Sequence, residues 1–270
     1  MTRTCFHNHL IPGVDDGSRD AGFSAGALAA FRREGVQQVI TTPHFMGSLT
    51  HQADALEARL AEFDAGWSVL RGLVDEDANT HGSAMRVERG VEVMLDVPDP
   101  VLTEPRLRLA GTRYVLVEYP GLQLPPVNAA MALGMIRQSG WTPVVAHPER
   151  YRNLDTLAPL GDFLAAGALL QVNAGSLFGD YGSKAQLRAQ EILTNGIASF
   201  VCSDYHARGE PGLLRFAQAL EQAGYGEQAR LLLEENPGRL LNDQAVVPVP
   251  AMATQRQAST TPWWKQMLGE

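Results

Sequence analysis

The amino-acid sequence predicts an α/β fold in which parallel strands alternate with helices and close into a barrel. Seven short β-branched or apolar runs recur along the 270 residues, and segments with apolar residues three or four positions apart lie between them. Strands that alternate with helices pair in parallel through right-handed crossovers. Seven such units in one chain favour a barrel over an open sheet.

The expected strands are short and rich in Val, Ile and Leu. They span residues 4–7, 37–42, 86–93, 113–118, 142–146, 168–173 and 199–203. The expected helices show the periodicity of an amphipathic helix. They span residues 23–34, 53–67, 127–139, 154–166 and 184–194. Four of these helices are followed by a glycine that we expect in a left-handed cap, namely Gly35, Gly140, Gly167 and Gly196.

Two segments fall outside this alternation. Residues 71–84 are polar and contain an acidic run at 75–77, so we predict a solvated loop there. The barrel domain is expected to span residues 1–244, because from Ala245 the composition turns to Pro, Thr and Ala. We predict that residues 245–270 are a tail without its own core. Its Trp263 and Trp264 are expected to dock on the barrel or a partner subunit rather than on a membrane, since only Lys265 adds positive charge beside them.

The composition narrows the class of protein. The formal net charge of −8 argues against a broad nucleic-acid-binding face, which needs clustered Lys and Arg. An acidic chain can still bind a phosphorylated substrate when cations reverse the charge of the site. The first residues lack the apolar run of a signal peptide, and no stretch is long and apolar enough for stable membrane insertion. We therefore expect a cytoplasmic protein, with Cys5 and Cys202 as buried thiols.

Histidine and acidic residues gather at the ends of the expected strands, the face where barrel enzymes build their sites. Residues two apart in a strand point the same way, so His7 and His9 can bind one ion together, and Asp204 and His206 repeat this spacing. Imidazole and carboxylate groups suit zinc, manganese or iron. Nine candidate ligands exceed the needs of one metal, so we expect two or three ions. The candidates are His7, His9, Asp16, His44, Glu92, Glu118, His147, Asp204 and His206.

Other polar residues near these positions have simpler interpretations. Asp15 belongs to an Asp-Asp-Gly sequence that is also ordinary turn chemistry, and Asp16 is favoured over it as a ligand. Glu149 is expected to orient its loop. His51 and His81 lie away from the strand ends and are predicted to be surface residues.

The motifs HNHLIPGVDDG, TPH, GVEV, VEYP, AHPERY, QVNAGSLFG and SDYH follow one another between residues 4 and 243. In this order they resemble the PHP-domain (polymerase and histidinol phosphatase) protein-tyrosine phosphatases of bacterial capsule and exopolysaccharide operons, the CpsB/CapC type. The HPERY and QVNAGS blocks separate this branch from histidinol phosphatases. The resemblance implies a distorted (β/α)₇ barrel with a three-metal centre, usually of manganese, with iron or zinc as alternatives.

The resemblance also implies roles for individual residues. Arg150 would contact the substrate phosphate, and Asp204 and His206 would be catalytic through their ions. The ligands would divide into three sets: His7, His9, Glu92 and Asp204; Glu92, Glu118 and His147; and Asp16, His44 and His206. Pro211 stands where the family has a second phosphate-binding arginine, so Arg208 is the candidate to replace that arginine. Asn173 is a further candidate for substrate binding. The backbone around residues 173–176 would form either an anion-binding nest or a tight structural turn. Tyr119, where the family has Leu or Phe, is expected to point away from the metal.

The function that follows is hydrolysis of a phosphomonoester, with phosphotyrosine on a polysaccharide-assembly tyrosine kinase as the implied substrate. Two metals would acidify a bridging water, and the resulting hydroxide would attack phosphorus. Alternatives are a small-molecule phosphatase of the histidinol-phosphatase type and a non-catalytic, metal-stabilised regulatory partner; the nine filled ligand positions favour catalysis. An amidohydrolase with a carbamylated lysine is disfavoured, because Lys184 and Lys265 are the only lysines and neither ends a strand.

Overall fold

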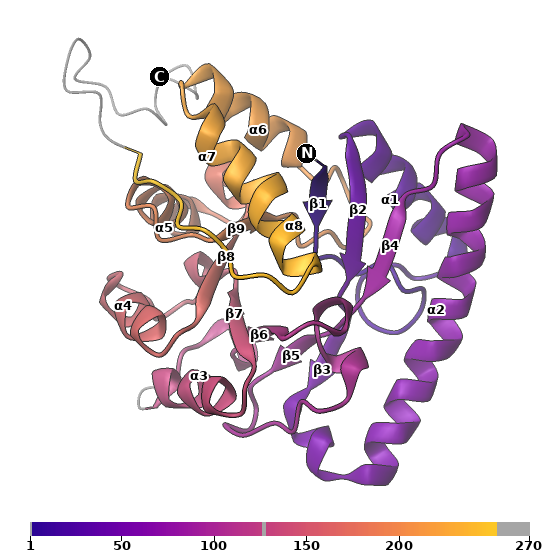
Figure 1. Ribbon diagram of the computed structural model, residues 1–270, viewed down its shortest axis with the longest axis horizontal. Coiled ribbons are helices and arrows are strands. Elements are labelled where there is room, and N and C mark those ends of the chain that lie inside the picture. Colours follow the sequence, from indigo (N-terminus) through magenta and orange to yellow (C-terminus); the bar gives the residue numbers. More distant parts are fainter. Residues whose placement is uncertain (1, 126–127, 253–270) are drawn as a thin grey trace.

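The structure is a computed structural model that describes residues 2–125 and 128–252. Its strands form a central ring, and helices surround them (Figure 1). All strand pairs are parallel. The described strands are β1 (Arg3–Cys5), β2 (Val36–Thr41), β3 (His44–Met46), β4 (Arg86–Arg89), β5 (Glu92–Met94), β6 (Tyr114–Glu118), β7 (Thr142–Ala146), β8 (Leu169–Asn173) and β9 (Phe200–Cys202).

Hydrogen bonds divide these strands into a three-stranded sheet, in the order β1-β2-β4, and a six-stranded sheet, in the order β3-β5-β6-β7-β8-β9. The two sheets are continuous across a break, because the amide of Gly90 donates to the carbonyl of Thr41 at 2.9 Å and that of Glu92 to Pro43 at 3.0 Å. β2 with β3, and β4 with β5, therefore each occupy one position in the barrel. The single strand expected at residues 86–93 is split here. A Cβ on Gly90 would lie 2.9 Å from the carbonyl oxygen of Arg108, so the break requires glycine.

The barrel closes between its first and last strands. Asn8 and Tyr205 form an isolated parallel bridge just beyond the ends of β1 and β9. The amide of His9 donates to the carbonyl of Tyr205 at 2.9 Å, and that of Asp204 donates to His7 at 2.9 Å. This narrow contact, which we call the β1–β9 seam, completes seven strand positions and confirms the predicted distorted barrel.

The helices lie outside the barrel, with α7 and α8 crossing the end from which the strands start (Figure 1). They are α1 (Ala21–Arg33), α2 (Ala53–His81), α3 (Ala129–Gln138), α4 (Ala158–Ala165), α5 (Ser183–Thr194), α6 (Leu213–Gln222), α7 (Gly226–Arg230) and α8 (Asn236–Leu241), with a π-helical turn between α7 and α8. No helix within the described ranges is both long and apolar enough to cross a bilayer.

The loop predicted at residues 71–84 is wrong, because α2 continues to His81. Leu70 and Val74 extend the buried stripe of this helix beyond its expected end and pack into the core. On the outer side, Asp77 forms an ion pair with Arg32 of α1. Tertiary burial and this pair stabilise a segment whose local composition is polar. The four predicted caps are confirmed, since Gly35, Gly140, Gly167 and Gly196 all have positive φ values.

The first residues of the expected tail lie against the barrel. Val249 and Met252 are buried, and the amide of Met252 donates to the carbonyl of Thr194 at the end of α5 at 2.9 Å. Asn236 holds the same segment through two hydrogen bonds with Val247. Residues 253–270, with Trp263 and Trp264, lie outside the described residues.

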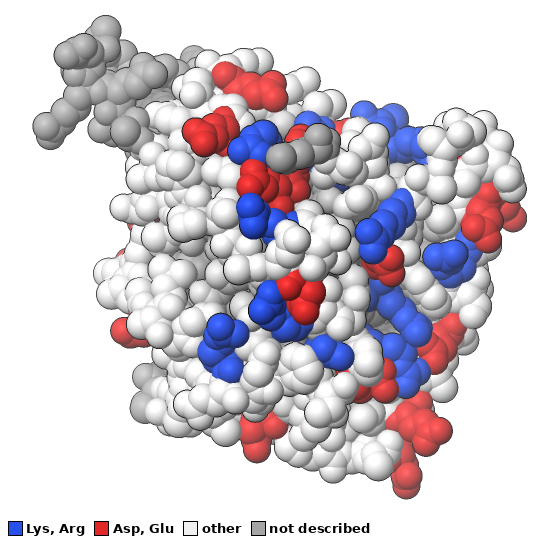
Figure 2. All heavy atoms as spheres, in the orientation of Figure 1, with Lys and Arg blue, Asp and Glu red and all other residues white. Residues whose placement is uncertain are grey.

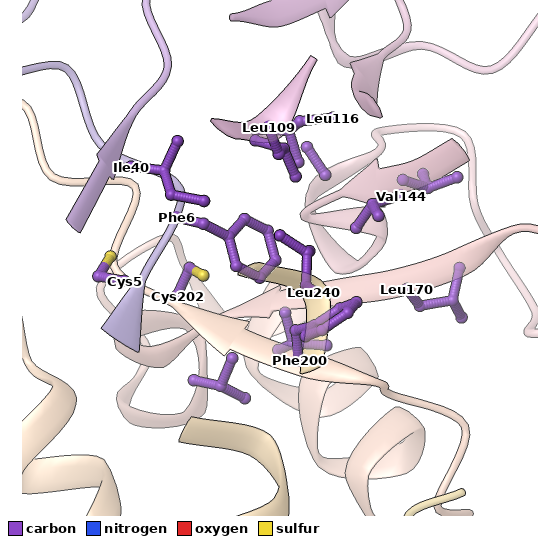
Figure 3. Close-up of a cluster of buried hydrophobic side chains, with 14 of the residues drawn as sticks. Cys5, Phe6, Ile40, Leu109, Leu116, Val144, Leu170, Phe200, Cys202 and Leu240 are labelled. Atoms are coloured by element: carbon purple, nitrogen blue, oxygen red, sulfur yellow. The ribbon is translucent and has the colours of Figure 1, made fainter. Parts of the chain in front are cut away.

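A cluster of buried apolar side chains fills much of the barrel interior. The rings of Phe6 and Phe200 meet edge to face with centroids 4.9 Å apart, and Leu240 of α8 packs beside them (Figure 3). Cys5 and Cys202 are both buried and free, as predicted, and they lie near each other on the first and last strands of the barrel (Figure 3). The predicted metal ligands lie outside this apolar cluster, at the end of the barrel where the strands finish.

Charged side chains are spread over the outer surface of the protein. In the face shown in Figure 2, Lys and Arg alternate with Asp and Glu, and neither sign forms one continuous field.

Candidate metal centre

The carboxyl ends of the strands bring all nine predicted ligands together. His7 and His9 follow β1, and Asp16 lies on the loop after them. His44 lies just beyond β2, as the first residue of β3, and Glu92 lies just beyond β4, as the first residue of β5. Glu118 ends β6, and His147 follows β7. Asp204 and His206 follow β9. Their side-chain nitrogen and oxygen atoms form four overlapping groups, each with all its atoms within 4.8 Å of one another. The groups are His9, Asp16, His44 and His206; His7, His9 and Asp204; His7, Glu92 and His147; and His44, Glu92 and Glu118.

Glu92 lies at the centre of this cluster and is fully buried. Its Oε2 lies 3.2 Å from Nε2 of His7 and 3.1 Å from Nδ1 of His44. Its Oε1 lies 3.1 Å from Nε2 of His147. Because its two oxygens face different histidines, this carboxylate can bridge two cations.

The outer nitrogens of three histidines are held by acceptors. Nδ1 of His7 lies 2.7 Å from Oε1 of Gln171, and Nδ1 of His9 lies 2.7 Å from Oδ2 of Asp15. Nδ1 of His206 lies 2.8 Å from the carbonyl oxygen of Asp204. An acceptor at Nδ1 places the ring proton there and leaves the Nε2 lone pair free for a metal.

The choice between Asp15 and Asp16 follows from the same geometry. Asp15 is turned toward His9 and also accepts from the amides of Gly17 and His44. Oδ1 of Asp16 lies 3.4 Å from Nε2 of both His44 and His206. Asp15 therefore orients a histidine, and Asp16 is the member of the pair that faces the cluster.

Several buried atoms of the cluster have no hydrogen-bond partner among the described residues. They are Nε2 of His7, Nε2 of His9, Nδ1 of His44 and Oε2 of Glu92. An unsatisfied buried polar atom costs about 1–3 kcal/mol. Cations would satisfy these lone pairs together, and the mixture of imidazole and carboxylate suits manganese, iron or zinc. The residues therefore fit the implied metals.

Without cations, protons balance the buried carboxylates. Burial alone lowers the pKa of His7, but the charges of Glu92 and Asp204 outweigh it and raise this pKa to about 8. Burial likewise opposes protonation of His9, whose pKa Asp15 and Asp204 raise to about 10. Burial disfavours the charged form of Glu92, yet the charge of His7 and the hydrogen bond from His147 hold its pKa well below the usual range. The cluster is thus built to hold positive charge.

Arg150 and Asn173 both bind one oxygen of Asp204. Nη1 of Arg150 and, at 2.9 Å, Nδ2 of Asn173 donate to Oδ2. Oδ1 is left facing the cluster, 3.2 Å from Nε2 of His7. Asn173 is fully buried, and its own Oδ1 accepts from Gln171 at 2.9 Å. The structure therefore places Asn173 behind Asp204 and not at the surface of the cleft.

The cluster forms the floor of an open cleft of about 250 Å³. Its walls are Asp16, His44, Glu118, Gly121, Leu122, His147, Arg150, Asp204 and His206. Two hollows of about 320 and 440 Å³ lie at the other end of the barrel around Gln38 and Arg86. They are larger, but no group of metal-ligating side chains was found there within the described ranges.

Comparison with known proteins shows the family to which the chain belongs. A sequence profile described as "Capsular polysaccharide synthesis, CpsB/CapC" matches residues 4–242. The chain belongs to the CpsB/CapC family.

Relatives of this CpsB/CapC chain include the tyrosine-protein phosphatase YwqE of Bacillus subtilis, 26% identical over 255 residues that cover 93% of this chain and 96% of the relative. The tyrosine-protein phosphatase CpsB of Streptococcus pneumoniae is 25% identical over 250 residues, covering 89% and 98% of the two chains. One solved chain from the work described as crystal structures of YwqE from Bacillus subtilis and CpsB from Streptococcus pneumoniae, unique metal-dependent tyrosine phosphatases, matches with a TM-score of 0.72 at 25% identity. The match covers 94% of this chain and 100% of the solved chain. The phosphotriesterase homology protein of Escherichia coli, solved with phosphate in its active site, has a TM-score of 0.53 at 16% identity over 89% and 98% of the chains. That likeness shows the barrel fold alone.

The position where CpsB/CapC members were expected to carry a second arginine is Pro211. Arg208 lies close by, and its Nη2 donates to the carbonyl oxygen of Asp16 at 3.0 Å. This places the Arg208 guanidinium beside the Asp16 loop at the edge of the cluster, but not among the walls of the cleft.

The remaining predicted positions are placed as follows in the CpsB/CapC chain. Tyr119 points away from the cluster, donating from its hydroxyl to the carbonyl of Ala129 at 2.6 Å. Glu149 is buried and accepts from the amide of Asn173 at 2.9 Å and from Oγ of Ser176 at 2.7 Å, as expected of a residue that orients loops. Residues 174–178 form a buried 3₁₀ turn, which agrees with the turn interpretation of this block. His51 and His81 have partly exposed side chains at the surface.

Two residues that support the site were not predicted from the sequence. Gln171 supports His7 from β8, and the two-residue spacing of Gln171 and Asn173 on one strand face is the signal that could have revealed it. Tyr181 lies under the guanidinium of Arg150, whose Cζ is 4.3 Å from the ring centroid. No sequence spacing links this tyrosine to Arg150.

Proposed function

We propose that this chain is a metal-dependent phosphomonoesterase that removes phosphate from tyrosine side chains of a protein. The observation that carries the proposal is the buried cluster around Glu92, where four overlapping ligand groups open into a cleft walled by one arginine. Membership of the CpsB/CapC family and similarity to proteins described as metal-dependent tyrosine phosphatases support the same function.

The nine clustered residues would hold two or three ions, manganese in our proposal, with iron or zinc as alternatives. When bound, such ions acidify a water to supply a nucleophile at neutral pH and neutralise the charge of the phosphate. Glu92 would be shared between ions, because its oxygens face His7 and His44 on one side and His147 on the other. Asp204 and His206 would hold ions from the last strand.

Arg150 would bind the phosphate oxygens. Nη1 is occupied by Asp204, and Asp204 is its one hydrogen-bonded partner among the described residues. The rest of its planar fork is thereby free for the two-point contact that guanidinium makes with phosphate. We propose that Arg208 adds positive charge at the rim, and that Asn173 positions Asp204 instead of touching substrate.

The size of the cleft suits a single phosphorylated side chain that enters it from a protein surface. Its volume of about 250 Å³ falls below the range of typical ligand pockets, roughly 300–1,000 Å³. Gly121 and Leu122 form a small, apolar part of its wall, where an aromatic ring attached to phosphate could rest. We propose a tyrosine kinase of capsule or exopolysaccharide assembly as the natural substrate and the cytoplasm as the location. The family's description, capsular polysaccharide synthesis, supports the process but names no substrate.

The test is to strip the purified protein of metal, restore Mn²⁺ and measure phosphate release. Substrates are a phosphotyrosine peptide, a phosphoserine peptide and histidinol phosphate, with Asp204→Ala as the control variant. We expect release from the phosphotyrosine peptide that is lost in Asp204→Ala. Release from histidinol phosphate alone would keep the metal chemistry and refute the protein substrate. No release from any substrate by a metal-loaded protein would refute catalysis and favour a regulatory role.

A further inference from the structure

Tyr181 lies on a tight turn at the edge of the metal cluster. The turn spans Gly179 to Gly182, closed by a hydrogen bond from the amide of Gly182 to the carbonyl of Gly179 at 2.9 Å. Both glycines have positive φ values, 86° and 90°. The turn is fastened further by the amide of Asp180, which donates to the carbonyl of Gly175 at 3.2 Å. The backbone therefore fixes the position from which the Tyr181 ring extends.

The loop that carries Arg150 is attached to the same part of the chain. Nη1 of Arg188, on α5 just after the turn, donates to the carbonyl of Glu149 at 3.2 Å and to that of Tyr151 at 2.6 Å. These carbonyls belong to the residues on either side of Arg150. The buried carboxylate of Glu149 accepts in turn from Ser176 at 2.7 Å. The backbones of Arg150 and Tyr181 are thus held in a constant relation to each other.

The guanidinium of Arg150 lies over the ring of Tyr181. Cζ of Arg150 lies 4.3 Å from the centroid of the Tyr181 ring, within the range of a cation–π contact. The Arg150 side chain is 22% exposed, and Tyr181 is 38% exposed. The ring contacts the guanidinium on one side and takes up none of its N–H groups as hydrogen-bond donors. Asp204 takes one of them, so the ring and the carboxylate together define the plane and the rotation of the fork.

We propose that Tyr181 is a positioning residue that holds the guanidinium plane of Arg150 so that its free N–H groups face the phosphate of a phosphotyrosine side chain. This inference rests on the proposed function and assigns a role within it. Burial raises the pKa of the Tyr181 phenol, so the ring carries no negative charge that would repel the phosphate at neutral pH. Arginine has four rotatable side-chain bonds, and a fork fixed before binding loses less freedom when it meets a phosphate.

The test is a double-mutant cycle on the metal-loaded protein, with Tyr181→Ala, Arg150→Ala and the double variant. Calorimetry with inorganic phosphate gives the dissociation constant, and hydrolysis of a phosphotyrosine peptide gives kcat and KM. Loss of an ordered cation–π contact should weaken phosphate binding by about 5- to 30-fold in Tyr181→Ala. Tyr181→Phe keeps the ring and should bind within about twofold of the unmodified protein. Because the effect passes through Arg150, the double variant should bind phosphate as weakly as Arg150→Ala alone.

Trp141→Ala is the matched control. Trp141 lies directly before β7, at the opposite end of the barrel from the metal cluster, and Cζ of Arg108 lies over its ring, 4.2 Å from the centroid. Its loss should leave phosphate binding unchanged. Metal content and melting temperature report whether each variant is folded and loaded.

The inference is overturned if Tyr181→Ala binds phosphate like the unmodified protein, or if the losses of Tyr181→Ala and Arg150→Ala multiply in the double variant. Failure of the proposed function has a different signature, the absence of phosphotyrosine hydrolysis by the unmodified, metal-loaded protein.

Discussion

Replacing Gln171 with leucine is expected to weaken metal binding while leaving the barrel folded. Oε1 of Gln171 lies 2.7 Å from Nδ1 of His7, and Nε2 of Gln171 donates to Asn173 at 2.9 Å. Asn173 then donates to Asp204 at 2.9 Å. One buried side chain therefore orients two proposed ligands, His7 just after β1 and Asp204 just after β9.

The size of the effect follows from these contacts. Leucine of similar volume leaves Nδ1 of His7 without an acceptor, so the ring is free to place its proton on the nitrogen that faces the cluster. Loss of an outer hydrogen bond of this kind lowers metal affinity by about 10- to 100-fold. That range corresponds to about 1.4–2.7 kcal/mol of binding free energy.

The assay is a competition for Mn²⁺ between the protein and a chelator of known affinity, followed by elemental analysis. Gln190→Leu is the matched control, because Gln190 is also buried but lies on α5, outside the groups of metal-ligating side chains. A Gln171→Leu protein that binds Mn²⁺ as tightly as Gln190→Leu would refute the idea that Gln171 fixes the His7 ring. A large fall in the melting temperature of the metal-free protein would show a structural role in its place.

Four further outcomes are expected. Arg150→Ala should lower kcat/KM for a phosphotyrosine peptide by about 100-fold or more, as for loss of a charge-stabilising donor, with metal content unchanged in elemental analysis; loss of metal would make Arg150 structural. His206→Ala should lower turnover by about 100-fold but keep the melting temperature of the metal-free protein, since this side chain is partly exposed; full activity after metal saturation would contradict its role. Mn²⁺ affinity should increase as the pH rises from 6 through about 8, because a metal needs neutral imidazole while the pKa values of His7 and His9 are raised to about 8 and about 10 in the metal-free protein. Calorimetry in buffers of different ionisation enthalpy should then detect proton release at pH 7, and its absence would show that these rings are already neutral. Leu70→Ala should destabilise the fold by about 2–5 kcal/mol in denaturant unfolding, and a loss below about 1 kcal/mol would mean that the second half of α2 adds little to the core.

The cluster could be predicted from the sequence because its geometry follows from local rules. Parallel strands bring their carboxyl ends to one face, so the positions of His7, Glu118 and Asp204 at strand ends already imply that these side chains converge. Their spacing and residue types carry the chemistry. The prediction of which aspartate faces the cluster, Asp16 over Asp15, agrees with the observed positions.

What could not be predicted depends on contacts between distant parts of the chain. The part of α2 beyond residue 70 has a polar composition that predicts a loop. It is helical because Asp77 pairs with Arg32, which lies far away in the sequence. The break between β4 and β5 arises where Gly90 passes the backbone of Arg108. Tyr181 likewise acquires its significance only from its ring contact with Arg150. Sequence periodicity contains no information about such pairs.

The β1–β9 seam has a consequence for folding. It joins segments about 200 residues apart through a single bridge, and contacts of such high sequence separation are slow to form because a long loop must close first. His7 and His9 lie on one side of it, and Asp204 and His206 on the other. Cations bound in common by both sides would bind the closed barrel and not the open one, and closure would then depend on metal concentration by mass action. Slowed hydrogen exchange of the His9 and Asp204 amides on metal addition would report this coupling, in which the ions that serve the chemistry also hold the first strand against the last.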